Sequence, residues 1–172
     1  MKKNLRLPDT LQDHNYSCGP VCAQCIMAYY GMDWREDILI KTLHTSIYGA
    51  KTNQIIEFFK TRGFKVKYGE FTITELKKFI DRKIPVICLL QAWKERKVNY
   101  MRSNAWGHYV VACGYDDKRI YFEDPAVFSL TYLFFAELEK RWHGIDKVKL
   151  EHFGIAVYGK RRFDFKKPIH MK

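Results

Sequence analysis

The chain has 172 residues and a net charge of +11, from 30 lysines and arginines against 19 aspartates and glutamates. Hydrophobic residues make up 47% of it and aromatic residues 16%, which excludes an intrinsically disordered chain. No run approaches the roughly 18 apolar residues of a membrane-spanning helix. We therefore expect a single domain over residues 1–172, with its core at about 5–158 and a basic tail at 159–172.

The N-terminus and the cysteines indicate a reducing compartment. Lys2 and Lys3 are compatible with the start of a signal peptide, but Pro8 and Asp9 arrive before any apolar stretch. The cysteine count of five is odd, which argues against a disulfide framework. We therefore expect a cytoplasmic protein.

Basic residues are concentrated at both ends and in the middle of the chain. A basic surface attracts acidic peptides, anionic lipid head groups or nucleic acid, although it also serves simply as a solvated face. No nucleic-acid-binding motif accompanies the charge. The groups are Lys2, Lys3 and Arg6; Lys94, Arg96, Lys97 and Arg102; and Lys160, Arg161, Arg162, Lys166 and Lys167.

Apolar residues in the first half repeat at spacings of three and four, which predicts helices. Gly31 ends the first of them, Thr52 is the expected N-cap of the third and Gly63 its C-terminal glycine, and Thr72 or Thr74 opens the fourth. The predicted elements are helices at 18–30, 34–43, 52–63 and 72–80, with a short strand at 64–68.

The second half is richer in strand patterns. Its predicted elements are a buried strand at 84–90, a basic loop at 93–106, a hairpin of strands 107–115 and 119–123 about a turn at 116–118, a helix at 131–142 and a strand at 153–158. Helices come first and mainly antiparallel strands later. This order predicts an α+β fold, with a helical part packed on a C-terminal sheet.

The segment from Gln12 to Pro20 carries the clearest chemical signal. Cys18 falls at the start of the first predicted helix, where Gly19 allows a tight turn and Pro20 needs no amide partner. Free N–H groups and the helix dipole favour a thiolate at this position and can stabilise an oxyanion. Gln12 can add a side-chain N–H to that oxyanion hole.

A thiolate nucleophile needs a base, and the base needs an orienting group. His108 begins a strand rich in β-formers, and Asp124 directly follows the next strand. The start of one hairpin strand lies beside the end of the next, so we expect Asp124 near His108. Glu123 is the alternative carboxylate, but neighbouring strand residues point to opposite faces and only one can serve.

These residues resemble the bacteriocin-processing, double-glycine family of cysteine peptidases, within the papain-like superfamily. The resemblance rests on the Gln12-to-Cys18 interval, Cys18-Gly19-Pro20, Gly107-His108-Tyr109-Val110-Val111, Asp124-Pro125, and the Phe134/Phe135-to-Trp142 segment.

The resemblance implies a papain-like fold in a bacterial protein that needs no cofactor or metal. It implies a peptide or protein substrate cleaved after a small Gly-Gly-type pair at the end of a leader peptide. The basic surface, and not the resemblance, is what favours an acidic substrate. Cys18, His108, Asp124 and Gln12 would be nucleophile, base, orienting group and oxyanion donor. The best-understood members are domains of ABC exporters, and we expect a standalone domain here.

Several alternatives stay open. Standalone papain-like relatives include amidases, acyltransferases or transpeptidases with the same residues, and non-catalytic peptide-binding domains. Cys18, Cys22 and Cys25 have the spacing of an iron–sulfur triad, but they lie in a helical pattern whose core face explains Cys22 and Cys25 more simply.

Substrate-binding candidates lie next to the catalytic positions. Trp93, Trp106 and Trp142 can wall a cleft, and Trp106 is preferred because it lies two residues before His108. Gly107 and Ser17 complete the expected substrate-binding set.

Overall fold

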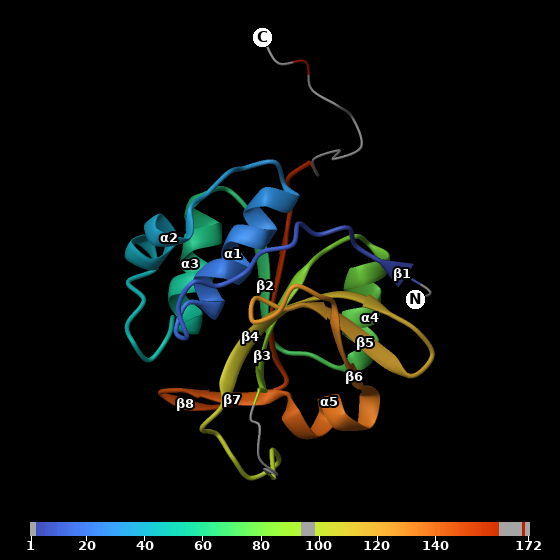
Figure 1. Cartoon of the computed structure of the whole chain (residues 1–172). Coiled ribbons are helices and arrows are strands. Elements are labelled where there is room, and N and C mark those ends of the chain that lie inside the picture. The colour runs from blue at the N-terminus through green and yellow to red at the C-terminus, as the bar shows by residue number, and fades with distance from the viewer. Residues whose placement is uncertain (1–2, 94–98, 162–169, 171–172) are drawn as a thin grey trace.

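The structure, a computed structural model, describes residues 3–93, 99–161 and 170 (Figure 1). Several basic residues singled out in the sequence therefore lie outside the described residues: Lys2, Lys94, Arg96, Lys97, Arg162, Lys166 and Lys167. Among the residues described, no helix has the length and apolar character to cross a membrane.

Helices and strands follow the predicted order closely. The elements are β1 (Lys3–Asn4), α1 (Cys18–Tyr29), α2 (Glu36–Thr42), α3 (Thr52–Thr61), β2 (Lys65–Glu70), α4 (Ile73–Asp81), β3 (Val86–Gln91), β4 (Gly107–Tyr115), β5 (Arg119–Glu123), β6 (Thr131–Phe134), α5 (Phe135–Arg141), β7 (His143–Asp146), β8 (Val148–Glu151) and β9 (Phe153–Tyr158). The α+β class, with helices first and antiparallel strands later, is confirmed.

The main sheet has the strand order β2-β9-β3-β4-β5-β6, and every neighbouring pair is antiparallel. The short β1 pairs with the end of β4, while β7 and β8 form a separate hairpin. The last strand, β9, lies between β2 and β3. The centre of the sheet is therefore built from segments far apart in the sequence.

Helices cover both faces of the main sheet. Helices α1, α2 and α3 lie on one side of it, and α4 and α5 lie on the other (Figure 1). Because strand side chains alternate, β4 contributes Tyr109 and Val111 to the core beneath α1–α3, and Val110 and Ala112 to the core beneath α4 and α5. Its first residues lie at the junction of the two sides.

The helix predicted at 131–142 is wrong in its first part. Residues 131–134 form β6, which pairs with β5, and only Phe135–Arg141 are helical. Tyr132 and Phe134 are 47% and 44% exposed, while the other residues of β6 are more buried. This alternation of exposed and buried residues is typical of a strand and competes with the helical pattern. Trp142 is fully buried and its indole N–H donates to the Phe153 carbonyl, so it does not wall a cleft.

The start of α3 also differs from its prediction. Lys51, not Thr52, occupies the N-cap position. The Thr52 backbone N–H and hydroxyl both donate to Asp146 Oδ2, each at 2.6 Å. A carboxylate from the unpredicted β7–β8 hairpin thus caps this helix and links the helical side of the molecule to the sheet side.

Candidate active site

Cys18 is the first residue of α1, as the sequence predicts, and is 7% exposed. Gly19 is required beside it, because a Cβ there would lie 3.0 Å from the Cβ of Ala50. The preceding loop is closed by Ser17, whose hydroxyl donates to the His14 carbonyl at 2.7 Å and accepts from the His14 N–H. Local hydrogen bonds therefore fix the position of the cysteine at the helix start.

His108 and Asp124 approach Cys18 from the sheet. The β4–β5 hairpin places Asp124, immediately after β5, beside the second residue of β4, and His108 Nε2 lies 2.8 Å from Asp124 Oδ1. The two side chains are only 10% and 2% exposed. The predicted hairpin thus brings this histidine and this aspartate into direct contact.

Four groups surround the Asp124 carboxylate. Oδ1 bonds His108 and accepts the Ala126 backbone N–H at 2.9 Å. Oδ2 accepts the Trp93 indole N–H at 3.0 Å and the Thr131 hydroxyl at 3.3 Å. A buried carboxylate so well supplied with donors remains ionised.

The electrostatics of the pair follow from these contacts. Burial lowers the pKa of His108, but hydrogen bonds to Asp124 and Cys18, with the negative charges of both, outweigh it and raise the pKa to about 9. Burial raises the pKa of Asp124, but its bonds to His108, Ala126 and Trp93 bring the pKa below its usual value. At neutral pH the site therefore holds an imidazolium between Cys18 and an ionised carboxylate.

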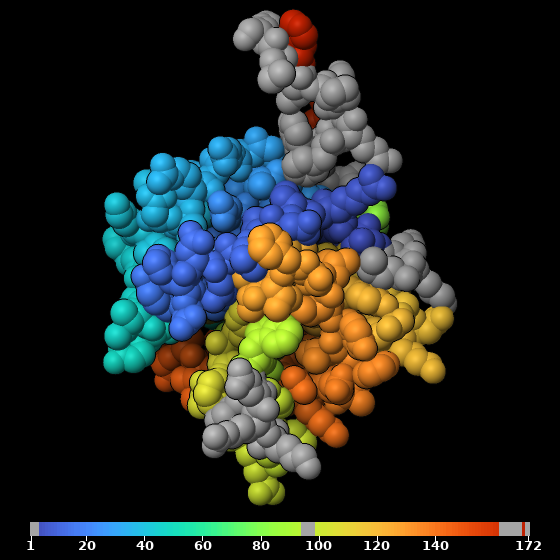
Figure 2. Space-filling view, in the orientation of Figure 1, coloured from blue at the N-terminus to red at the C-terminus, as the bar shows by residue number. Residues whose placement is uncertain are grey.

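Gln12 lies on the segment that leads into α1. Its backbone N–H donates to the Pro125 carbonyl at 2.9 Å, so this segment adjoins the loop after Asp124. Figure 2 shows the blue N-terminal segment running beside the orange one. The Gln12 Nε2 donates to the His14 carbonyl, while Oε1 is buried with no partner among the described residues. One amide hydrogen therefore remains for a further acceptor.

Of the expected substrate-binding residues, Gly107 is exposed and Ser17 is buried. Gly107 is exposed at the start of β4. Trp106 precedes it, and its backbone N–H donates to Gln91 Oε1 at 3.0 Å. Ser17 is fully buried against His14 and presents no hydroxyl to a substrate.

Sequence reasoning missed the contacts of Asp124 with Trp93 and Thr131. The sequence predicts Trp93 only as a cleft wall or a core residue, because it lies in an irregular basic stretch. The pairing of Leu90 with His108 carries the end of β3 toward the site, and recognising that pairing is the signal that could have found Trp93.

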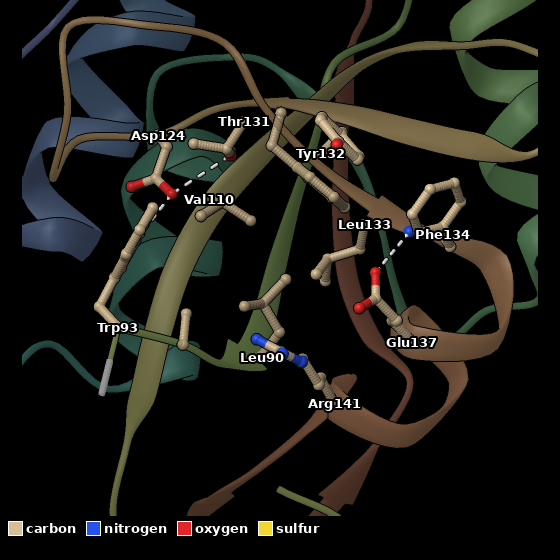
Figure 3. Close-up of a pocket in the computed structure, with 12 residues that line it drawn as sticks. Leu90, Trp93, Val110, Asp124, Thr131, Tyr132, Leu133, Phe134, Glu137 and Arg141 are labelled. Atoms are coloured by element: carbon tan, nitrogen blue, oxygen red, sulfur yellow. Dashed lines mark hydrogen bonds between the residues drawn. The ribbon is translucent and has the colours of Figure 1, made fainter. Parts of the chain in front are cut away.

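A cavity of about 320 Å³ lies on the other side of Asp124. Trp93 and Asp124 lie at one end of it, and Glu137 and Arg141 at the other (Figure 3). The wall between them is largely apolar and consists of Leu90, Val110, Phe122 and Leu133 with other side chains of β6.

The remaining cysteines are core residues, as expected from their apolar surroundings. Cys22, Cys25, Cys88 and Cys113 are each no more than 1% exposed, and burial raises the pKa of every one of these thiols. Within the described residues there is no group of histidine, cysteine or acidic side chains arranged to hold a metal.

Comparison with known proteins agrees with this architecture. A C39-like peptidase from Bacillus anthracis has 17% identity and a TM-score of 0.71, covering 94% of this chain and 99% of that one. The peptidase domain of Streptococcus ComA, a bifunctional ABC transporter in quorum sensing, has 19% identity and a TM-score of 0.67, covering 88% and 96%.

A double glycine motif protease from an AMS/PCAT transporter, solved with its leader peptide, has 17% identity and a TM-score of 0.65, covering 91% and 94%. No curated protein matches the chain. The model of the Peptidase C39 family matches residues 6–146, most of the chain. The chain therefore belongs to the C39 family of cysteine peptidases.

Proposed function

We propose that this peptidase cleaves peptide bonds with Cys18 as nucleophile, His108 as acid and base, and Asp124 as the group that orients His108. The observation that carries the proposal is the 2.8 Å contact between His108 Nε2 and Asp124 Oδ1. Cys18 is close enough to the same imidazole to raise its pKa. This is the order of groups that thiol hydrolysis requires.

The reaction proceeds in two steps. The Cys18 thiolate attacks the scissile carbonyl carbon; the C–N bond then breaks as His108 gives its proton to the leaving amine, leaving a thioester. Water then attacks the thioester, His108 takes its proton, and the C–S bond breaks to release the acid. The free amide hydrogen of Gln12 and the N–H groups at the start of α1 are the proposed donors to the oxyanion.

The proposed substrate is an extended peptide cleaved after a small pair of the Gly-Gly type. Support comes from the family match and from the structurally similar protease that was solved with a leader peptide. The net charge of +11 favours acidic segments in that peptide by electrostatic steering.

A peptide-cleavage assay tests the assignment of the nucleophile. We expect wild-type protein to cleave a Gly-Gly-containing peptide from a defined library, with products identified by mass spectrometry, and Cys18→Ala to yield none. Cys22→Ala is the matched control, because it removes a thiol one helical turn away and leaves the site intact. Cleavage by Cys18→Ala, or none by the wild type on any peptide, contradicts the proposal.

Alkylation gives a second test that needs no substrate. At neutral pH, iodoacetamide should modify Cys18 first, because burial raises the pKa of the other four thiols. His108→Ala should slow modification of Cys18 by roughly tenfold or more. Equal labelling of Cys18 in both proteins would remove the thiol–imidazole pair from the mechanism.

A further inference from the structure

We propose that Trp93 is a positioning residue that holds the Asp124 carboxylate in register with His108. The inference rests on the proposed role of the Asp124–His108 pair and adds a residue to it. Trp93 comes from the segment after β3, and its indole N–H donates to Asp124 Oδ2 at 3.0 Å, opposite the oxygen that faces His108.

The orientation of the Asp124 carboxylate has to be restrained by hydrogen bonds. Rotation about the last bond of an aspartate side chain is broad, so the packing of the chain does not by itself fix which way the oxygens face. Oδ1 is held by Ala126 and shared with His108, whereas Oδ2 has two donors. The Thr131 hydroxyl is the more distant of these, at 3.3 Å, so Trp93 is the main restraint on Oδ2.

Neither burial nor backbone preference explains where Trp93 lies. The residue is 53% exposed, so burial of the ring does not fix its position. Its φ of +58° lies in the left-handed region, which is costly for a bulky residue and is found where surrounding structure enforces it. The hydrogen bond to Asp124 is the contact that this conformation secures.

Hydrogen bonds at the end of β3 hold the backbone just before Trp93. The Gln91 side chain is fully buried and accepts the Trp106 N–H, while its own amide donates to the His143 carbonyl at 3.0 Å. The Ala92 N–H donates to the Trp106 carbonyl at 3.1 Å. Trp93 therefore starts from a fixed point, and its strained turn directs the indole toward Asp124 and the end of the cavity (Figure 3).

The effect of losing the indole donor can be read from the pH dependence of Cys18 alkylation. Burial raises the pKa of Asp124, the hydrogen bond and charge of His108 lower it, and the hydrogen bonds of Ala126 and Trp93 lower it further. Glu123 and Cys22 are acidic groups whose own pKa values the charge of Asp124 raises. Without the donor, Asp124 takes up a proton at higher pH, and the imidazolium loses its partner there. The acid limb of the alkylation profile should move upward in pH.

The experiment compares wild type, Trp93→Phe and Trp34→Phe over a pH series, with iodoacetamide as the probe. Trp34 is a partly exposed tryptophan that contacts Arg62 and Phe58, so its replacement controls for loss of an indole elsewhere. Trp93→Phe should lower the Cys18 alkylation rate at acidic pH roughly three- to tenfold and shift the acid limb, and Trp34→Phe should do neither.

A second measurement keeps the inference testable if Trp93→Phe folds poorly. In wild-type protein the indole N–H of Trp93 should exchange slowly with solvent by NMR, although its ring is half exposed, and Asp124→Asn should alter that protection. An unchanged acid limb in a folded Trp93→Phe, or fast exchange in the wild type, overturns the role of Trp93 alone. A wild-type Cys18 without enhanced reactivity overturns the proposed function itself.

Discussion

Two neighbouring carboxylates at the end of β5 face opposite sides of the sheet and meet opposite electrostatic conditions. Asp124 faces His108, and that contact brings its pKa below the usual value despite burial. Glu123 faces the α1 side near Cys25 and Cys113, where burial and the charge of Asp9 raise its pKa to about 7.

The difference shows that partners, more than depth, decide the charge of a buried acid. Glu123 is 5% exposed and Asp124 is 2% exposed, so both have lost most of their water. Asp124 gains a cationic partner and several hydrogen-bond donors in exchange. Glu123 accepts a backbone hydrogen bond from Thr10, but the negative charge of Asp9 opposes its ionisation. One step along the chain therefore separates a carboxylate in contact with a histidine from one whose pKa is raised by burial.

The largest effect should come from replacing Asp124 by its amide, with the same replacement at Glu123 as the matched control. Asp124→Asn should lower kcat/KM for peptide cleavage about a hundredfold or more, because the imidazolium loses its negative partner. Glu123→Gln should stay within about twofold of wild type, since its side chain points away from His108. Equal losses in both variants would contradict the comparison.

The pH profile should change with the same pair. In the wild type, activity should decline on the alkaline side with a midpoint near pH 9, as His108 loses its proton. Asp124 is among the groups that raise this pKa, so Asp124→Asn should move the alkaline midpoint downward. The measurement is kcat/KM for peptide cleavage against pH, and a profile that does not move assigns the limb to another group.

Replacing Glu123 should change the stability of the fold and not the rate of catalysis. The pKa of Glu123 rises from 4.5 to about 7 on folding. Its contribution to the free energy of unfolding is therefore fully present below about pH 4.5, where the carboxyl is protonated, and is lost as the pH rises through about 7. Relative to wild type, Glu123→Gln should gain about 3 kcal/mol of unfolding free energy between these limits. Urea unfolding of both proteins at pH 4.5 and pH 8 measures it, and a pH-independent difference would rule this out.

The smallest effect should come from the weaker donor to Asp124. Thr131→Val keeps the shape of the side chain and removes a hydroxyl bond of 3.3 Å, so we expect kcat/KM to fall roughly twofold. Thr42→Val is a suitable control, because the Thr42 hydroxyl donates to the Ile38 carbonyl within α2, away from Asp124. A loss as large as that of Asp124→Asn would mean that Thr131 has a role beyond this hydrogen bond.

The sequence could predict those parts of the site that depend on local structure. Cys18 at a helix start follows from Gly19 and Pro20, and the contact of His108 with Asp124 follows from a hairpin with a short turn. The turn itself is held locally by the Asp116 carboxylate, which accepts the N–H groups of Lys118 and Arg119.

Parts that depend on distant segments could not be predicted this way. The indole of Trp93 reaches Asp124 across 31 positions, and Asp146 caps α3 across 94. Neither contact leaves a periodic pattern in the sequence. The pattern of residues 131–142 predicts a helix throughout, but Tyr132 and Phe134 lie in a strand because that segment pairs with β5.

The place of β9 in the sheet has a consequence for how the chain matures during translation. β2 pairs with β9, so it leaves the ribosome with its partner residues 153–158 still unmade. At about 5–20 residues per second the wait is on the order of ten seconds. Throughout that interval β2 exposes unpaired backbone, a target for chaperones and for other nascent chains. The insertion of β9 between β2 and β3 therefore completes the centre of the sheet only after residues 153–158 have been made.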